Sequence, residues 1–568
     1  MPRVIDLVVE VITQAGIDHA FCLPGGYTQF LIEALYQNKD KINVIVTRHE
    51  GGASAMADIY GRITKKPGLL LGQGLWIATN GAFGIVEAFL AGSPMLIITD
   101  ISDWNNLNLH GPYQCGSGEY GSVDLPNILR SMTKFTTYAT SPKDVVYGVQ
   151  LAIKHAISGR PGPAAVITKM TSIGGFIDDP TSLDPPIYPS KGYLRVSPPS
   201  IAKSDAEKMA DYLINAEKPV LICGRGIHVS NAYEEVQKLA ELIGIPVATS
   251  YMGKSSIAET HDLALGVMAD RGQKLATDLI SKADTILAVG TCLAPDNTND
   301  CSKKFIDVEN QKILHIDIDP RNAAWTYPVT LGVASDAKLG LRAIINAIKA
   351  KNPQIDVQKR ISTLLELKAK PENEFFTSKW YESTKIPIEP ERIVKEINEL
   401  IREEDLLVLD AGNNRIWFCK MFKSKKAGQV ISPGGAAGMA WGPSASVAAQ
   451  LLNTEGKVVS TVGDGGIMMS LYNFETVKQY NIPLMYVVFN NQSLGNVRDF
   501  FSRKGRPLAE YPGTNFAEIA NSMGVEGIRV EELDDLRPTL EKGFKSDKPI
   551  VVDIVTSRAS HLRVRTSL

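Results

Sequence analysis

The chain has 568 residues, of which 44% are hydrophobic and 21% are charged, and its formal net charge is −2. This is the composition of an ordinary globular protein of several domains, without the basic excess that would favour nucleic-acid binding. No apolar run reaches the ~18 residues that a membrane helix requires.

The first third alternates helix and strand patterns. Apolar spacing predicts a helix over 4–15, a strand over 20–23 that leads into Pro24-Gly25-Gly26, a helix that ends near 38, and a strand over 42–46. Glu50 follows, at the start of a helix rich in small residues. Its glycine neighbours would let another group approach closely. An acidic residue in a first helical turn is also favoured by the helix dipole alone.

The same α/β pattern continues beyond this helix. Leu69-Leu70-Leu71 predicts a strand that ends in Gly72-Gln73-Gly74, and further strands are expected over 94–99 and 164–166. Residues 180–199 are rich in Pro, Ser and Asp, which is typical of a linker. We therefore place an N-terminal domain at residues 1–180.

The middle third predicts a second parallel α/β domain, residues 195–350. Its expected strands are 219–223, 246–249, 285–289 and 312–317. Gly224-Arg225-Gly226 follows the first strand, and glycines in such a turn either approach a nucleotide or simply allow tight strand–helix packing. A charged, largely helical stretch over 351–385 leads into a C-terminal domain, residues 375–568.

The last third contains two stretches rich in small residues. A strand over 406–409 ends in Asp410-Ala411-Gly412-Asn413-Asn414, and residues 432–443 form a second stretch that includes Ala437 and Met439. Taken alone, Met439 is equally suited to filling a core.

A βαβ unit with a glycine-rich turn follows. A buried strand over 458–462 leads into Gly463-Asp464-Gly465-Gly466, a helix reaches about Tyr480, and a second strand over 484–489 ends in Asn490-Asn491. Phosphates bind at such turns in doubly wound sheets, and carboxylate, amide and carbonyl oxygens suit Mg2+. A lone Gly-Asp-Gly is also common turn chemistry. The whole pattern predicts an α/β fold of three doubly wound parallel-sheet domains.

Two motifs resemble the thiamine diphosphate enzymes of the acetolactate synthase, pyruvate oxidase and 2-hydroxyacyl-CoA lyase superfamily. In one, Asn491 follows Asp464 by 27 positions, which is similar to the family's GDG…NN motif. The other is RHEGGASAMADIYGR around Glu50. The resemblance covers nearly the whole chain. It implies a pyrimidine-binding N-terminal domain, a central domain that holds FAD, ADP or nothing, and a diphosphate-binding C-terminal domain.

The resemblance also implies roles for individual residues. Glu50 would bind the aminopyrimidine N1′, and Met439 would wedge the cofactor into a V shape. Mg2+ would be held by Asp464, Asn491 and the Ser493 carbonyl. The implied catalytic positions are Glu50, Gln73, where many relatives have Pro, and His110, which is equally suited to a structural role. The implied cofactor-binding residues are Gly25, Gly26, Asn413, Asn414, Ala437, Met439, Gly463, Asp464, Gly465, Gly466, Asn491, Ser493, Leu494 and Gly495.

In relatives, Glu50 and the Mg2+ residues meet across a subunit interface, so the resemblance implies a homodimer at least and a homotetramer as the common assembly. It implies a lyase or carboligase acting on a 2-oxo acid, through decarboxylation to an enamine and then protonation or ligation to a second carbonyl. The alternatives are a 2-hydroxyacyl-CoA lyase or oxalyl-CoA decarboxylase acting on an acyl-CoA, an FAD-dependent pyruvate oxidase-type enzyme, and a non-catalytic paralogue.

Three positions depart from biosynthetic acetolactate synthases. Gly121 stands where those enzymes carry Gln, residues 290–297 lack their Arg, and Phe500 replaces a Trp. The spacing from Tyr120 to Asp124 instead resembles a sequence motif of the oxalyl-CoA decarboxylases and 2-hydroxyacyl-CoA lyases. The basic tail 558–568 would either close over an anionic substrate or remain solvated.

The six cysteines are scattered and form no CxxC pair. We therefore expect neither a zinc site nor a disulfide framework. A reducing compartment, the cytoplasm, is the expected location.

Overall fold

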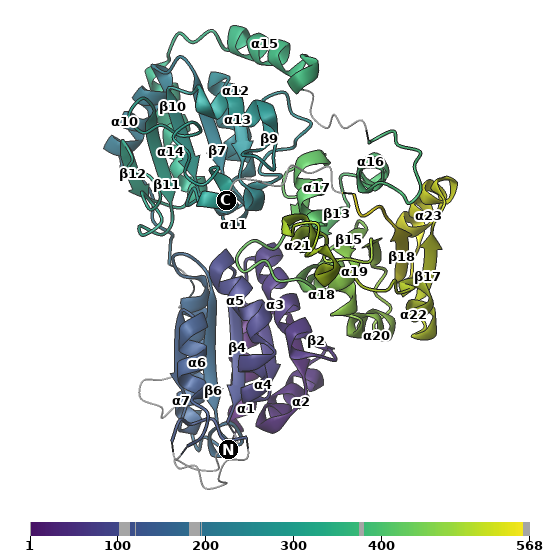
Figure 1. Ribbon diagram of the computed structural model, residues 1–568. Coiled ribbons are helices and arrows are strands. Elements are labelled where there is room, and N and C mark those ends of the chain that lie inside the picture. Colours follow the sequence, from purple (N-terminus) through teal and green to yellow (C-terminus); the bar gives the residue numbers. More distant parts are fainter. Residues whose placement is uncertain are drawn as a thin grey trace.

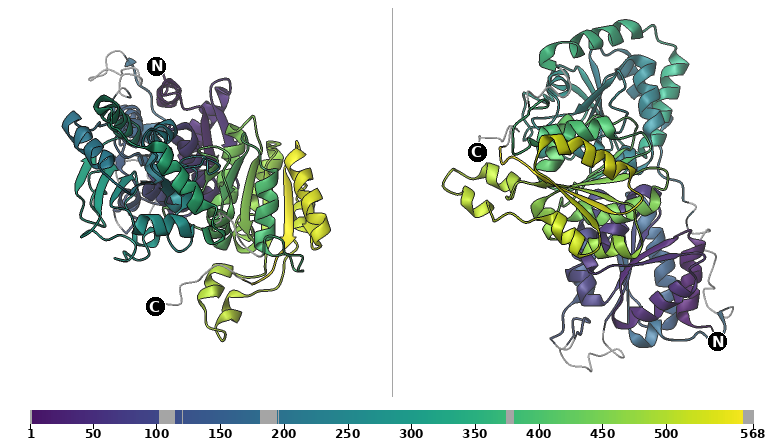
Figure 2. Two further views of the ribbon diagram at one scale, coloured as in Figure 1. Left: turned by 90° about the horizontal axis from the view of Figure 1, so that it is seen from above. Right: turned by 90° about the vertical axis from the view of Figure 1, so that its right-hand side faces the viewer.

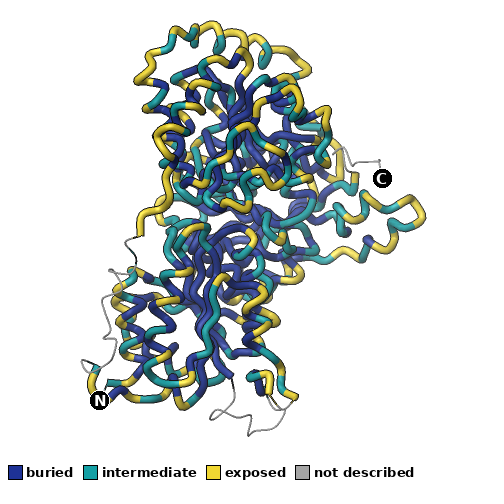
Figure 3. Tube along the Cα trace, turned by 90° about the vertical axis from the view of Figure 1, so that its left-hand side faces the viewer, coloured by how far each residue is buried: buried dark blue, intermediate teal, exposed yellow. Residues whose placement is uncertain are grey.

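Three parallel β-sheets of six strands each organise the chain, which confirms the predicted α/β fold (Figure 1). The computed structural model describes residues 2–101, 114–119, 121–180, 194, 196–373 and 380–559. The central unit lies above the N-terminal unit in Figure 1, and the C-terminal unit lies beside both. Buried stretches run through the interior of all three units, and exposed residues lie mostly on the outer turns (Figure 3).

The N-terminal sheet has the strand order β2-β1-β3-β4-β6-β5. Its strands are β1 (His19–Leu23), β2 (Asn43–Val46), β3 (Gly68–Gly72), β4 (Met95–Asp100), β5 (Phe135–Tyr138) and β6 (Pro163–Thr168). Its helices are α1 (Val4–Gln14), α2 (Gln29–Gln37), α3 (Glu50–Thr64), α4 (Gly74–Thr79), α5 (Ala82–Ala91), α6 (Leu125–Met132), α7 (Pro142–Ile157) and α8 (Met170–Ile173). β3 and β4 are buried along their whole length, and their leucine, isoleucine and methionine residues form uninterrupted apolar runs without alternation.

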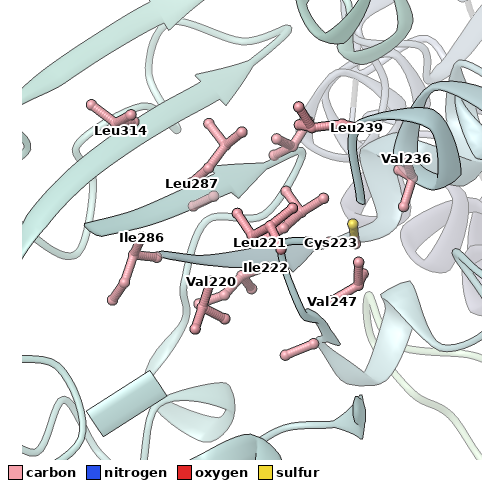
Figure 4. Close-up of a cluster of buried hydrophobic side chains, with 14 of the residues drawn as sticks. Val220, Leu221, Ile222, Cys223, Val236, Leu239, Val247, Ile286, Leu287 and Leu314 are labelled. Atoms are coloured by element: carbon pink, nitrogen blue, oxygen red, sulfur yellow. The ribbon is translucent and has the colours of Figure 1, made fainter. Parts of the chain in front are cut away.

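The central sheet has the order β12-β11-β10-β7-β8-β9, the arrangement of dinucleotide-binding folds. Its strands are β7 (Pro219–Cys223), β8 (Val247–Thr249), β9 (Ala264–Val267), β10 (Thr285–Val289), β11 (Lys312–Asp317) and β12 (Leu331–Ala334). Its helices are α10 (Lys203–Ile214), α11 (Arg225–Val229), α12 (Tyr233–Ile243), α13 (Lys274–Ser281) and α14 (Ala337–Lys351), with α15 (Val357–Lys368) beyond them. Apolar side chains of β7, β10 and α12 form its core (Figure 4).

The C-terminal sheet, β14-β13-β15-β16-β18-β17, repeats the strand order of the N-terminal sheet. Its strands are β13 (Leu406–Leu409), β14 (Val430–Ile431), β15 (Val458–Gly463), β16 (Met485–Asn490), β17 (Glu526–Val530) and β18 (Ile550–Val555). Its helices are α16 (Pro390–Leu400), α17 (Asn413–Met421), α18 (Trp441–Leu452), α19 (Asp464–Met468), α20 (Tyr472–Gln479), α21 (Gly495–Phe500), α22 (Phe516–Ser522) and α23 (Leu533–Lys545). The segment with α21 extends away from the rest of this unit (Figure 2).

The prediction of one continuous helix from the glycine turn to about Tyr480 is wrong. The structure divides it into α19 and α20. The Ser470 hydroxyl, between them, donates to the Gly466 and Ile467 carbonyls. A serine that bonds back to the preceding turn competes with the helical ladder, and the glycines at the start of α19 add little helix propensity.

A buried ion pair of the central unit is hydrogen-bonded to the C-terminal unit. The Lys254 ammonium lies 2.7 Å from both carboxylate oxygens of Glu259 and 2.7 Å from the Phe422 carbonyl. The two side chains are 2% and 1% exposed. Replacing Lys254 with methionine leaves the Glu259 carboxylate buried without its counter-charge, which costs about 3–5 kcal/mol.

We therefore expect Lys254→Met to lower the midpoint of urea unfolding strongly. Lys238→Met, which removes an exposed ion pair with Glu234, should change stability by less than about 1 kcal/mol. Equal midpoints for the two variants would contradict this account of the domain contact.

Candidate functional site

Glu50 is the first residue of α3, at the carboxyl edge of the N-terminal sheet. It is 8% exposed, and its carboxylate accepts a hydrogen bond of 3.1 Å from the Asn80 side-chain amide. The preceding His49 caps the helix by accepting from the Gly51 N–H. The helix begins at Glu50 because His49 is extended and caps it, and the small residues that follow pack closely in its first turns.

Gly25, Gly26 and Gln73 lie at the same edge, after β1 and β3. A Cβ on Gly26 would collide with the Asp100 carboxylate, and φ there is +60°, so only glycine fits. A Cβ on Gly25 would lie 3.5 Å from Gln73, whose amide donates to the Gln114 side chain. This edge therefore brings Gly25, Gly26 and Gln73 together.

Asp100 is a buried acid at this edge that the sequence did not single out. It ends β4 and accepts hydrogen bonds from the N–H groups of Tyr27 and Gly74, at 2.5 and 3.1 Å. Burial raises the pKa of Asp100 to about 6, against the opposing effect of these two donors. It fixes the two loops that carry Gly26 and Gln73.

The carboxyl edge of the C-terminal sheet brings the three expected metal residues together. The Ser493 N–H lies 3.3 Å from an Asp464 carboxylate oxygen and 3.1 Å from the Asn491 amide oxygen. Burial raises the pKa of Asp464, while hydrogen bonds from Tyr511 and nearby backbone N–H groups oppose that shift. Asn490 instead donates to the Thr514 carbonyl and to Asp553, so it supports the strand end.

The donor chemistry of this cluster fits Mg2+. One carboxylate, one amide oxygen and a nearby carbonyl are the hard oxygen ligands that this ion prefers. Within the described ranges, no group of three or more His, Cys, Asp or Glu side chains is arranged to hold a metal ion. Asp464 is only 2% exposed, and a bound cation would compensate its buried charge.

The remaining C-terminal residues surround the same point. A Cβ on Gly465 would lie 2.9 Å from Leu494 and 3.0 Å from Met439, so these three are neighbours. A Cβ on Gly495 would meet the side-chain amides of Asn491 and Asn413. Asn413 also donates to Asp499 at 2.8 Å. A Cβ on Gly463 would meet nothing within 4 Å, which leaves room beside the turn.

Two further residues shape this edge and were missed by sequence reasoning. The Tyr511 hydroxyl donates to Asp464 at 2.7 Å. The buried Asp410 accepts from the N–H groups of Ala440 and Gly442 at 2.9 Å, and burial raises its pKa to about 6. The strand end before Asp410 was a usable signal, whereas Tyr511 lies in an irregular segment without one.

Asn414 and Ala437 complete the expected set. Asn414 donates to the Asp410 and Ala411 carbonyls and so shapes the first turn. Ala437 has φ of +53° and lies in the small-residue loop. His110 lies outside the described residues. We call Glu50, Gly25, Gly26 and Gln73 the Glu50 group, and Asp464, Asn491 and Ser493 the Asp464 group. Between described residues of one chain, no hydrogen bond or ion pair joins these two groups.

A cavity of about 620 Å³ lies where the three units meet. It adjoins the carboxyl ends of β7 and β10, between which the strand order of the central sheet reverses, the usual position for a nucleotide. Arg160, Arg225, Gly290 and Asp317 are among its lining residues.

Comparison with known proteins gives three matches in chain order. The N-terminal TPP binding domain of the thiamine pyrophosphate enzymes matches residues 2–115, their central domain matches 206–344, and their C-terminal TPP binding domain matches 410–554. Among the described residues, no helix combines the length and apolar content needed to cross a membrane.

Several proteins that are similar over nearly the whole chain are named as acetolactate synthases. The chain is 28% identical to the probable acetolactate synthase large subunit of Methanocaldococcus jannaschii, over 98% of this chain and 92% of the relative. It is 28% identical to the acetolactate synthase large subunit of Haemophilus influenzae, over 98% and 95% of the two chains. It is 24% identical to the mitochondrial acetolactate synthase of Schizosaccharomyces pombe, over 97% and 83%.

Proposed function

The chain belongs to the thiamine diphosphate-dependent enzymes of the acetolactate synthase and pyruvate oxidase superfamily, and from that premise we propose a thiamine diphosphate- and Mg2+-dependent lyase or carboligase acting on a 2-oxo acid. The observation that carries the proposal is the convergence of Asp464, Asn491 and Ser493 beside Gly465 and Met439. The names of the full-length relatives support the acetolactate synthase-like reaction.

Each residue at the two sheet edges has a distinct role in this proposal. Bound thiamine diphosphate supplies carbanion-stabilising chemistry that protein side chains lack. Asp464, Asn491 and the Ser493 carbonyl would hold Mg2+, and the backbone N–H groups of the turn would face the diphosphate. Met439 and Leu494 would provide apolar contact to the middle of the cofactor. Glu50 would exchange a proton with the pyrimidine N1′.

The separation of the two residue groups supports a homodimer as the minimal active unit. Within one chain, Glu50 contacts its own N-terminal unit through Asn80, whereas Asp464 is bonded to Tyr511 and Ser493. A second copy would bring its N-terminal edge to the C-terminal edge of the first, and a tetramer would pair two such dimers. All six cysteines are free thiols, which supports a cytoplasmic location.

The charges around the three-unit cavity support a bound FAD or ADP. Lys65 and Arg225 line it, and among the described residues neither is hydrogen-bonded to a carboxylate. Burial, together with Arg225 and Arg62, lowers the pKa of Lys65 to about 7. A nucleotide diphosphate would supply the missing negative charge.

A second candidate is a 2-hydroxyacyl-CoA lyase or oxalyl-CoA decarboxylase-type reaction, and a third is an FAD-dependent oxidase. The acyl-CoA reaction is favoured by the spacing from Tyr120 to Asp124, which resembles a motif of oxalyl-CoA decarboxylases and 2-hydroxyacyl-CoA lyases. Phe500, in place of the Trp of acetolactate synthases, is a second departure that favours a substrate other than theirs. The oxidase is favoured by the size of the cavity, about 620 Å³.

Product analysis separates these reactions. The purified protein is incubated with thiamine diphosphate, Mg2+ and a panel of 2-oxo acids and acyl-CoAs, and the products are identified by mass. We expect turnover of a 2-oxo acid, with CO2 release and a ligated or protonated product. Turnover of acyl-CoAs alone, or flavin absorbance with oxygen uptake, would select one of the other candidates.

A further inference from the structure

One carboxylate of the N-terminal unit holds the small-residue loop of the C-terminal unit. Glu87, on α5, accepts four backbone hydrogen bonds from this loop. The N–H groups of Gly434 and Gly435 donate to one oxygen at 3.0 Å, and those of Ala436 and Ala437 donate to the other at 2.8 Å. Glu87 is 1% exposed, so these bonds form in a nearly dry environment.

A buried arginine keeps this carboxylate charged. Arg62, at the end of α3, lies 2.7 Å from Glu87 and 2.7 Å from Asp58. Burial alone would raise the pKa of Glu87, but Arg62 and the backbone donors lower it to about 2. Arg62 also donates to the Ser432 carbonyl at 2.9 Å, where the loop begins. The acceptor therefore stays ionised across the physiological range.

The loop needs such an external support. Ala437 and Ala440 have φ of +53° and +73°, a region that residues with a side chain rarely adopt without surrounding constraints. Met439 lies between them and reaches Gly465 of the turn that begins with Gly463. The conformation that brings Met439 to the turn is thus fixed by hydrogen bonds from both sides, Glu87 before it and Asp410 after it.

Helix α3 carries Glu50 at one end and, near its other end, the arginine that pairs with Glu87. Glu50 begins the helix, and Arg62 near its other end pairs with both Asp58 and Glu87. Trp441, the first residue of α18, donates to Asp58 at 2.9 Å. In the proposed dimer, Glu50 serves the cofactor on the other chain, while Arg62 and Glu87 support the loop of their own chain.

We propose that Glu87 is a positioning residue that sets the cofactor-facing conformation of residues 434–440 within its own chain. This inference rests on the proposed function, because the loop matters only if a cofactor binds beside it. It adds a role for a residue that the N-terminal unit contributes without touching the cofactor.

The first test compares Glu87→Gln, Glu87→Asp and Gly435→Ala. In Glu87→Gln, the side-chain NH2 group would face backbone N–H donors and could not accept their hydrogen bonds. A Cβ on Gly435 would lie 2.8 Å from the Glu87 carbonyl oxygen and displace the loop while the ion cluster remains. Glu33→Gln, on the exposed face of α2, is the matched control. Thermal unfolding of each variant without cofactor reports whether it folds.

We expect Glu87→Gln and Gly435→Ala to raise the thiamine diphosphate dissociation constant about tenfold, measured by tryptophan fluorescence at saturating Mg2+. Their kcat should fall roughly 10- to 100-fold, because small displacements of positioning groups cost that much. Glu87→Asp should recover part of both. If folded Gly435→Ala and Glu87→Gln bind the cofactor within twofold of the parent protein, the inference is wrong. If the parent protein itself binds none, the proposed function fails instead.

Hybrid dimers test whether the effect stays within one chain. Each hybrid pairs two differently tagged chains, one of which carries Asp464→Asn, so that a single intact diphosphate site remains. Placing Glu87→Gln on the chain with the intact diphosphate site should lower activity as in the homodimer. Placing it on the Asp464→Asn chain should leave the activity of the reference hybrid unchanged. The reverse pattern would show that Glu87 acts on the partner's site.

Discussion

Replacing Glu50 with glutamine should lower kcat about 100-fold or more, the usual loss when a positioned proton-transfer group is removed. Glutamine keeps the shape of the side chain and can still contact Asn80, but it cannot exchange a proton with the pyrimidine. The cofactor should continue to bind, because its diphosphate and Mg2+ would be held by the Asp464 group at another sheet edge.

The measurement is steady-state turnover of the 2-oxo acid substrate, together with the thermal shift produced by thiamine diphosphate and Mg2+. Glu10→Gln, an exchange on the exposed face of α1, serves as the control and should retain full turnover. A Glu50→Gln variant with the kcat of the unmodified protein would remove Glu50 from the mechanism.

Replacing Asp464 with asparagine should abolish cofactor binding at concentrations that saturate the unmodified protein. Asp464 is the only carboxylate of the proposed metal set, and its neighbours Asn491 and Ser493 are uncharged. At a concentration 100 times the dissociation constant, binding stabilises the folded protein by about 2.7 kcal/mol. This increment should disappear in the variant.

The thermal shift with thiamine diphosphate and Mg2+ measures the loss directly, and omission of Mg2+ should reduce the shift of the unmodified protein in the same way. Asp535→Asn, on an exposed turn of α23, should keep the full shift. An Asp464→Asn variant that is stabilised as much as the unmodified protein would place the metal elsewhere.

Much of the fold was predictable because parallel strands buried on both faces are short apolar runs. β3, β7, β13 and β16 were visible for this reason. The strand order was not visible, since pairing depends on packing between distant segments. The identity of strand order between the N- and C-terminal sheets appears only in the structure.

Likewise, only some residues of the candidate site could be predicted from the sequence. Asp464 and Asn491 could be placed together because each follows a strand, and strand ends meet at one sheet edge. Glu87 could not be assigned, because its partners lie about 350 positions away and the four donors are backbone groups that leave no sequence pattern. Asp100 and Tyr511 were missed for a similar reason, since their partners lie on loops of the same unit that are distant in sequence.

The central claim is that each active site combines Glu50 of one chain with Asp464 of another. It is tested most directly by mixing the inactive Glu50→Gln and Asp464→Asn proteins under conditions that exchange subunits. Half of the resulting dimers would be hybrids with one fully intact site, so about a quarter of the activity of the unmodified protein should return. Activity that stays at the level of the two separate variants after exchange is verified would contradict a site shared between chains.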